Sequence, residues 1–210
     1  MRIDHLVVTA PSLEAGSDHV AEALGVAPGP GGRHDGMGTH NLLLSLGPEV
    51  YIEVIAVDPD APEPSRARMF GLDADPGAPR LASWVARCDD LRAEVAQAPD
   101  MLGEIIDLAR GDLSWSMTAP PGGRMPYDGI APPLISWTGG TCAQDLLPPS
   151  DLRFERLILR HPRSEELQLN WPVLGQLDRV TLEPGPVPSL EAEILTAMGM
   201  RRLSSAVAAG

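Results

Sequence analysis

Two residues in the N-terminal quarter of the chain, His5 and Glu53, have the side chains and the spacing to form a buried polar site. Each alternates with apolar residues, so each faces an apolar side of a strand. An inward-facing carboxylate is costly unless it is paired, hydrogen-bonded or bound to a cation. We therefore expect the two side chains to converge from adjacent strands in one cavity. A His–Glu hydrogen bond without metal and a shared divalent ion both remain open.

Two further histidines, His34 and His40, lie in the segment GGRHDGMGTHN, which we expect to be a glycine-rich loop that leads into a strand. At the strand edge, His40 could face the same cavity as His5. It would then act as a third metal ligand or as an acid–base group; the alternative is a side chain that caps local backbone. His34 is a candidate for contacting substrate at the mouth of the cavity, and its alternative is a solvated loop residue.

Aromatic and basic residues of the second half supply further candidates for substrate binding. Trp84, Trp115 and Trp137 occur once in each of three predicted strands, where they form either an aromatic wall of a ligand cavity or part of the core. Arg124, in the proline-rich segment PGGRMPYDG, could reach an anionic substrate or stay in solvent.

Composition and charge exclude several classes of function. The net charge of −13 argues against partners that need a basic surface, namely nucleic acids and anionic membranes. No apolar run is long enough to span a bilayer. The isolated Cys88 and Cys142 do not form a CxxC motif, so we expect reduced thiols. The N-terminus MRIDHLVVTA is typical of a strand rather than a signal peptide, which favours a cytoplasmic protein with a small-molecule partner.

The elements that must position these residues repeat along the chain. The patterns predict a first βαβββ module over 1–58, a second over 80–140, and a partial third unit, βαββ, over 150–200. The first module is expected to contain a strand over 3–9, a helix over 12–25, and strands over 41–46 and 51–57. All three units are assigned to one domain.

Several of these stretches resemble a known family. IDHLVVTAPSLEAG, the segment GGRHDGMGTHNLLLSLG and YIEVIAVDP resemble the first module of the glyoxalase-like proteins of the vicinal oxygen chelate superfamily. PLISW and LILRHPRSEELQ resemble later parts of the same domain. The resemblance implies an α+β fold in which paired βαβββ modules form an open cup-shaped sheet, with a shorter C-terminal βαββ addition. We expect each module to contribute mainly its own sheet.

The resemblance also implies a metal site. It places the first-module ligands on His5 and Glu53, and we predict a set of His5, Glu53 and His40, with Glu53 and His40 as catalytic residues. The ion would be zinc, manganese, iron or nickel at low occupancy. The second-module ligand positions offer no good donor to such an ion; they fall on Ser83, Trp84, Ser136 and Trp137.

Two functions follow from the resemblance. One is a divalent-metal-dependent lyase, isomerase or dioxygenase, in which the ion polarises vicinal oxygens of a small molecule. The other is a metal-free small-molecule binding or sequestration protein of the bleomycin-resistance type, which the missing second-module ligands favour. A dimeric interaction module without a ligand is a third alternative, and formation of a homodimer stays open in each case.

Overall fold

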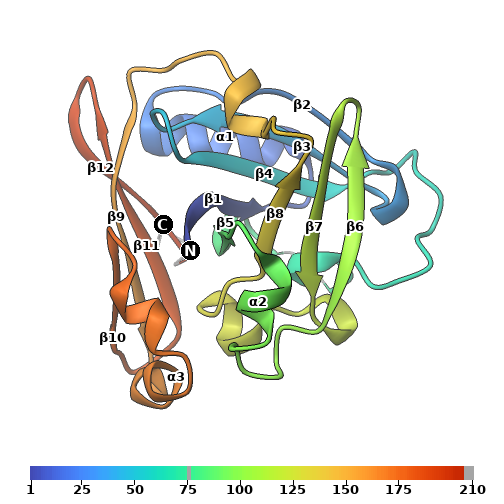
Figure 1. Cartoon of the computed structure of the whole chain (residues 1–210). Helices are drawn as coiled ribbons and strands as arrows, with labels where there is room; N and C mark the ends of the chain where they lie inside the picture. The colour runs from blue at the N-terminus through green and yellow to red at the C-terminus, as the bar shows by residue number, and fades with distance from the viewer. Residues whose placement is uncertain (75–76, 206–210) are drawn as a thin grey trace.

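The structure, a computed structural model, describes residues 1–74 and 77–205. An eight-stranded sheet curls into an open cup, and a four-stranded sheet lies beside it (Figure 1). This is the α+β architecture with a cup-shaped sheet that the sequence predicts. The large sheet consists of β1 (Arg2–Thr9), β2 (Gly29–His34), β3 (Thr39–Ser45), β4 (Tyr51–Val57), β5 (Arg80–Arg87), β6 (Glu104–Arg110), β7 (Leu113–Ala119) and β8 (Leu134–Thr138).

The first half of the large sheet is a βαβββ module that contains the helix α1 (Leu13–Leu24). The helix begins where the sequence predicts, because the Ser12 side chain accepts a hydrogen bond from the Ala15 N–H at 3.1 Å. It ends at Gly25, whose φ of 78° is a left-handed conformation that glycine adopts without strain. Within the module, β1 and β4 pair in parallel and β3 pairs antiparallel to β4.

The second half repeats this arrangement with the short helix α2 (Leu91–Val95). Here β5 and β8 pair in parallel, and β7 pairs antiparallel to both β8 and β6. An antiparallel ladder between β1 and β5 joins the halves, which gives the strand order β2-β3-β4-β1-β5-β8-β7-β6. The expectation of a separate sheet for each module is therefore wrong.

A bulge in β1 changes the direction of one acidic side chain. Ile3 pairs with Ala86 and His5 pairs with Val85, so Asp4 is an extra residue in its strand. A bulge interrupts the alternation of side chains. Simple alternation would place Asp4 on the face opposite His5, but the irregularity allows the two consecutive side chains to meet.

The glycine-rich segment after α1 is partly a strand rather than the predicted loop. β2 pairs antiparallel with β3, a 3₁₀ turn spans Asp35–Met37, and β3 begins at Thr39, two residues before the predicted start. Backbone hydrogen bonds to β3 hold β2 in place. A glycine-rich strand has few side chains to show the period-2 pattern from which strands are predicted.

The C-terminal unit forms the small sheet and has one strand more than the predicted βαββ unit. The additional strand, β12, is largely exposed, so its sequence MRRLS lacks the alternation of a half-buried strand. β12 packs against α1 and β5 of the large sheet. The unit consists of β9 (Arg153–His161), α3 (Ser164–Asn170), β10 (Val180–Pro184), β11 (Ser189–Thr196) and β12 (Gly199–Ser204), with sheet order β10-β9-β11-β12.

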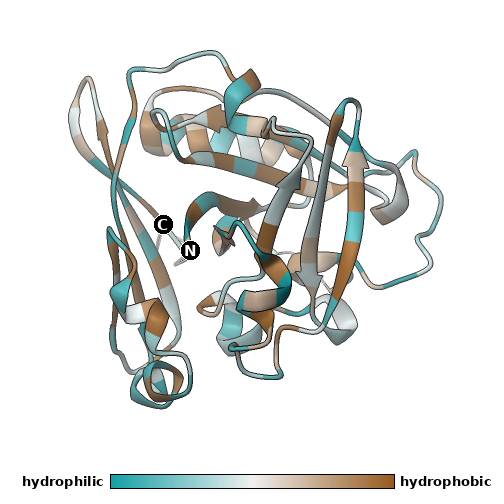
Figure 2. Cartoon of the chain, in the orientation of Figure 1, coloured by the Kyte–Doolittle hydropathy of each residue, from teal (hydrophilic) through white to brown (hydrophobic). Residues whose placement is uncertain are grey.

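Two apolar clusters occupy the two faces of the large sheet. The larger one joins α1, one face of the large sheet and the small sheet, and it includes Leu6, Trp84 and Leu159. The smaller one lies on the other face and includes Val7 and Val85. Hydrophobic residues are conspicuous along β4 and at the start of β8 in Figure 2, whereas α3 and many of the connections are more hydrophilic. None of the helices in the described part of the chain combines the length and apolarity that crossing a bilayer requires.

Candidate functional site

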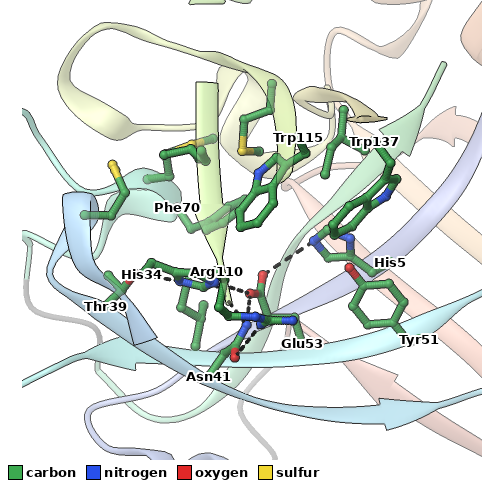
Figure 3. Close-up of a pocket in the computed structure, with 16 residues that line it drawn as sticks. His5, His34, Thr39, Asn41, Tyr51, Glu53, Phe70, Arg110, Trp115 and Trp137 are labelled. Carbon is green, nitrogen blue, oxygen red and sulfur yellow. Dashed lines mark hydrogen bonds and ion pairs between the residues drawn. The ribbon is translucent and has the colours of Figure 1, made fainter. Parts of the chain in front are cut away.

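A cavity opens in the cup, next to the smaller apolar cluster (Figure 3). Its walls are mainly apolar and aromatic, and its polar groups come almost entirely from the first half of the sheet. It is lined by His5, His34, Met37, Thr39, Asn41, Tyr51, Glu53, Ile55, Met69, Phe70, Leu108, Arg110, Trp115, Met117, Ile135 and Trp137.

The predicted convergence of His5 and Glu53 is confirmed. β1 and β4 are adjacent, and Glu53 pairs with Val7, two residues along the strand from His5. The Nε2 atom of His5 lies 3.4 Å from Oε2 of Glu53. Both side chains are buried, with exposed fractions of 4% for His5 and 7% for Glu53. The pair therefore lies where a charged group needs a partner.

Asp4 is a second carboxylate on the same imidazole, and alternation alone does not predict it. Its Oδ1 atom lies 2.7 Å from Nδ1 of His5, and its Oδ2 atom accepts a hydrogen bond from Nε1 of Trp137 at 2.8 Å. Arg87 also contacts Asp4, with its Nε atom 3.2 Å from Oδ2. Both ring nitrogens of His5 thus face a carboxylate.

These contacts fix the charges of the site at neutral pH. Burial alone lowers the pKa of His5, but the hydrogen bonds to Asp4 and Glu53 outweigh it and raise that pKa from 6.5 to about 9. Burial raises the pKa of Glu53, but the hydrogen bond and charge of His5 lower it from 4.5 to about 2. A general acid or base works best with a pKa near the working pH. The pair is therefore a stable imidazolium–carboxylate contact and a poor proton shuttle.

Asn41 connects the first half of the site to the second, and it is not among the site residues predicted from the sequence. Its Nδ2 atom donates to Oε1 of Glu53 at 2.6 Å and lies 3.3 Å from Nε2 of His34. Its Oδ1 atom accepts from the Gly32 N–H at 2.9 Å and from Nη1 of Arg110 at 2.8 Å. If β3 is known to begin at Thr39, the alternation of side chains places Asn41 on the same face as Thr39 and Leu43.

Two of the three predicted tryptophans form an aromatic wall. The rings of Trp115 and Trp137 lie 5.3 Å apart, and His34 meets Trp115 edge-on at 6.0 Å. Across the site, Tyr51 stacks on the His5 ring at 4.7 Å. His34, Trp115 and Trp137 thus line the cavity, as expected for residues that contact a ligand.

Three other sequence candidates lie elsewhere. Because Thr39 and Asn41 line the cavity, His40 between them points to the opposite face of β3, so it is not in place to be the predicted third ligand or acid–base group. Trp84 is completely buried in the core on the other face of β5, where Nε1 donates to the Ile130 carbonyl at 2.9 Å. Exposed Arg124 borders a different hollow.

The donor set does not fit the divalent ion that the resemblance implies. In the second half, β8 offers Ile135 and Trp137 to the cavity and β5 offers Val85 to the cluster beside it, and none of these is a metal ligand. His5 already has a carboxylate at each ring nitrogen. No group of three or more His, Cys, Asp or Glu side chains suitable for holding a metal ion occurs in the part of the chain that the structure describes.

Comparisons with known proteins agree with this fold. Residues 3–175 match the family model described as a glyoxalase-like domain. A hypothetical protein from Staphylococcus aureus superposes with a TM-score of 0.62 and 16% identity, covering 89% of this chain and 87% of that one. No curated protein sequence matches the chain significantly.

Two enzymes of known name give weaker superpositions. For a methylmalonyl-CoA epimerase from Mycobacterium tuberculosis, the TM-score is 0.42 at 14% identity, covering 65% of this chain and 86% of that one. For a Mn(II)-bound glyoxalase from Novosphingobium aromaticivorans, the TM-score is 0.45 at 10% identity, covering 97% of this chain and 81% of that one. Neither likeness carries a conclusion about the reaction.

Proposed function

Because the chain belongs to the glyoxalase-like domain family, and because its cup lacks a matching set of metal ligands, we propose that it binds a small, largely apolar molecule without a metal ion. The observation that carries this proposal is the apolar face that β8, in the second half of the sheet, turns toward the cavity. Where a donor would be needed opposite His5 and Glu53, the strand β8 presents Ile135 and Trp137.

The polar groups of the first half support binding rather than metal-assisted chemistry. Glu53 has a partner for each carboxylate oxygen, because His5 faces Oε2 and Asn41 donates to Oε1. A carboxylate satisfied in this way is stable in a buried site without a cation. His5 and Glu53, which the resemblance assigns as metal ligands, therefore have partners within the protein.

The shape and chemistry of the cavity fit an aromatic ligand. Trp115 and Trp137 present ring faces and edges that favour stacked or tilted contacts with another ring. Met37, Met69 and Met117 complete the wall. Methionine side chains are flexible and polarisable, so a wall of this kind can adapt to ligands that differ in shape. We infer a preference for planar aromatic molecules and tolerance toward their substituents.

Calorimetric titration with 2-naphthalenemethanol, a neutral aromatic probe, tests this proposal. Protein dialysed against EDTA and checked by elemental analysis should bind the probe, and adding zinc, manganese, iron(II) or nickel should leave the affinity unchanged within about twofold. Trp115→Ala should weaken binding about tenfold or more, because burial of an aromatic side chain is worth roughly 1.5 to 3 kcal/mol. Leu169→Ala, at an exposed position of α3, is the control. A stoichiometric ion that dialysis does not remove, and on which probe binding depends, would refute the proposal.

A further inference from the structure

Arg110 is a positively charged side chain in the cavity, and none of the described carboxylates forms an ion pair with it. It ends the strand β6, is half-buried and lines the cavity together with His5 and Glu53 (Figure 3). Its Nη1 atom donates to Oδ1 of Asn41, which is a neutral amide. Among the described residues, no carboxylate oxygen lies within 4.0 Å of its guanidinium nitrogens, and no acceptor is hydrogen-bonded to Nε or Nη2.

The other arginines of the described chain show that this is unusual for the protein. Most form an ion pair with a carboxylate within 4.0 Å, as expected for a chain that has 29 acidic and 16 basic residues. Four other described arginines have no carboxylate within 4.0 Å, but they are exposed, so water solvates the charge. They are Arg92, Arg124, Arg153 and Arg201. Arg110 differs from these four because its unpaired charge borders an apolar cavity.

The backbone is shaped to hold Arg110 where it is. The stem of Arg110 crosses Gly32, where a Cβ atom would lie 2.7 Å from Cδ of the arginine. A Cβ atom at Gly31 would collide with Oδ1 of Asn41. The two consecutive glycines thus make room for Arg110 and for the amide that holds it. Because Asn41 binds only one of the terminal nitrogens, the Nε–Nη2 edge of the guanidinium has no protein partner among the described residues.

The two carboxylates nearest the His5 ring, Glu53 and Asp4, are paired with groups other than the Arg110 guanidinium. The negative charge of Glu53 faces the His5 imidazolium at 3.4 Å, and Asp4 contacts both His5 and Arg87. Neither carboxylate forms an ion pair with Arg110. A guanidinium edge with two parallel N–H groups matches the geometry of a carboxylate, which it binds bidentately.

We propose that Arg110 binds the carboxylate of the ligand, so that the ligand class is a planar aromatic carboxylate. The aromatic body lies against Trp115 and Trp137, and the carboxylate meets the Nε–Nη2 edge of Arg110 at the rim. This inference rests on the proposed function, since it requires an aromatic molecule in the cavity. It adds a charged recognition group that the sequence candidates did not include.

The test compares 2-naphthoate with 2-naphthalenemethanol, which share the ring system and differ in charge. By calorimetry at low salt, wild-type protein should bind the carboxylate about ten- to a hundredfold more tightly, the range expected for a charge-assisted bidentate contact. This preference should shrink at high salt. Arg110→Gln should remove the preference, so that the two probes bind with affinities within about threefold of each other, and Arg92→Gln should leave both affinities unchanged.

The outcomes separate this inference from the proposed function. If the alcohol binds and the carboxylate binds no more tightly, or if Arg110→Gln keeps the preference, the role of Arg110 is overturned and the proposed function stands. If neither probe binds to wild-type protein, both are overturned. Arg110→Lys keeps the charge without the two-pronged edge and should lose only part of the preference. It also tests the role of Arg110 if Arg110→Gln does not fold.

Discussion

Replacing Glu53 by glutamine should change how the stability of the protein depends on pH. The substitution keeps the shape of the side chain and an oxygen for Asn41, but it removes one of the two charges that hold the His5 imidazolium. The pKa of His5 is about 9 in the folded chain and 6.5 in the reference state. A shift of this size corresponds to about 3 kcal/mol of folding free energy.

The sign of the effect follows from the direction of each shift. The pKa of His5 is raised by folding, so its contribution is fully present below about pH 6.5 and is lost as pH rises through about 9. The pKa of Glu53 is lowered by folding, so its contribution is present above pH 4.5 and is lost as pH falls through about 2. The free energy of unfolding should therefore fall by about 3 kcal/mol between pH 6.5 and 9 in the wild type.

In Glu53→Gln this alkaline loss should shrink to about 1 to 2 kcal/mol, because only Asp4 still favours the imidazolium. Urea unfolding followed by tryptophan fluorescence at pH 6, 7, 8 and 9 measures the slope, and NMR titration of the His5 ring gives its pKa directly. Glu14→Gln, at an exposed position of α1 where the side chain forms no ion pair with the described residues, should follow the wild-type curve. Equal slopes in wild type and Glu53→Gln, or a His5 ring that titrates near 6.5, would refute the ion-pair assignment.

Two further substitutions test how the cavity is built. Gly31→Ala should destabilise the protein by about 1 to 3 kcal/mol in urea unfolding, because its methyl group would collide with Asn41; Gly36→Ala in the same segment has open space and should be nearly neutral. Trp84→Phe should lower stability by about 1 to 3 kcal/mol through loss of the bond to the Ile130 carbonyl. It should leave the affinity for 2-naphthalenemethanol unchanged within about twofold. A larger loss of affinity would show that Trp84 contributes to ligand binding.

The sequence predicts the position of a site residue where a local side-chain pattern buries a group that can carry a charge. Alternation with apolar neighbours placed both His5 and Glu53 on a buried face, and the cost of an unpaired carboxylate required a partner for Glu53. Together with the family resemblance, which assigns both residues to one site, these two arguments predict their contact. The cap at Ser12 and the left-handed stop at Gly25 are similarly local, so the limits of α1 could also be predicted.

Features that depend on distant contacts could not be predicted in this way. Asp4 reaches His5 because of a bulge in the pairing of β1 with β5, which no pattern within β1 reveals. Gly32 is needed because Arg110, far along the chain, crosses it. The prediction for His40 fails because the residue lies within β3 and not at its edge. Alternation in the strand turns His40 to the face opposite the neighbouring Thr39 and Asn41.

The two halves of the sheet contribute different groups to the cavity, and this difference explains both the His5–Glu53 ion pair and the role proposed for Arg110. The strand β8 supplies no metal ligand opposite Glu53. The Glu53 carboxylate is instead bound by His5 and Asn41, so little of its hydrogen-bonding capacity remains for a ligand. Affinity must then come mainly from the aromatic and methionine walls, which distinguish poorly between similar ligands. Arg110 is half-buried, so its charge keeps some contact with water until a ligand arrives. The choice between charged and neutral ligands therefore falls to Arg110, which is linked to the buried pair only through Asn41.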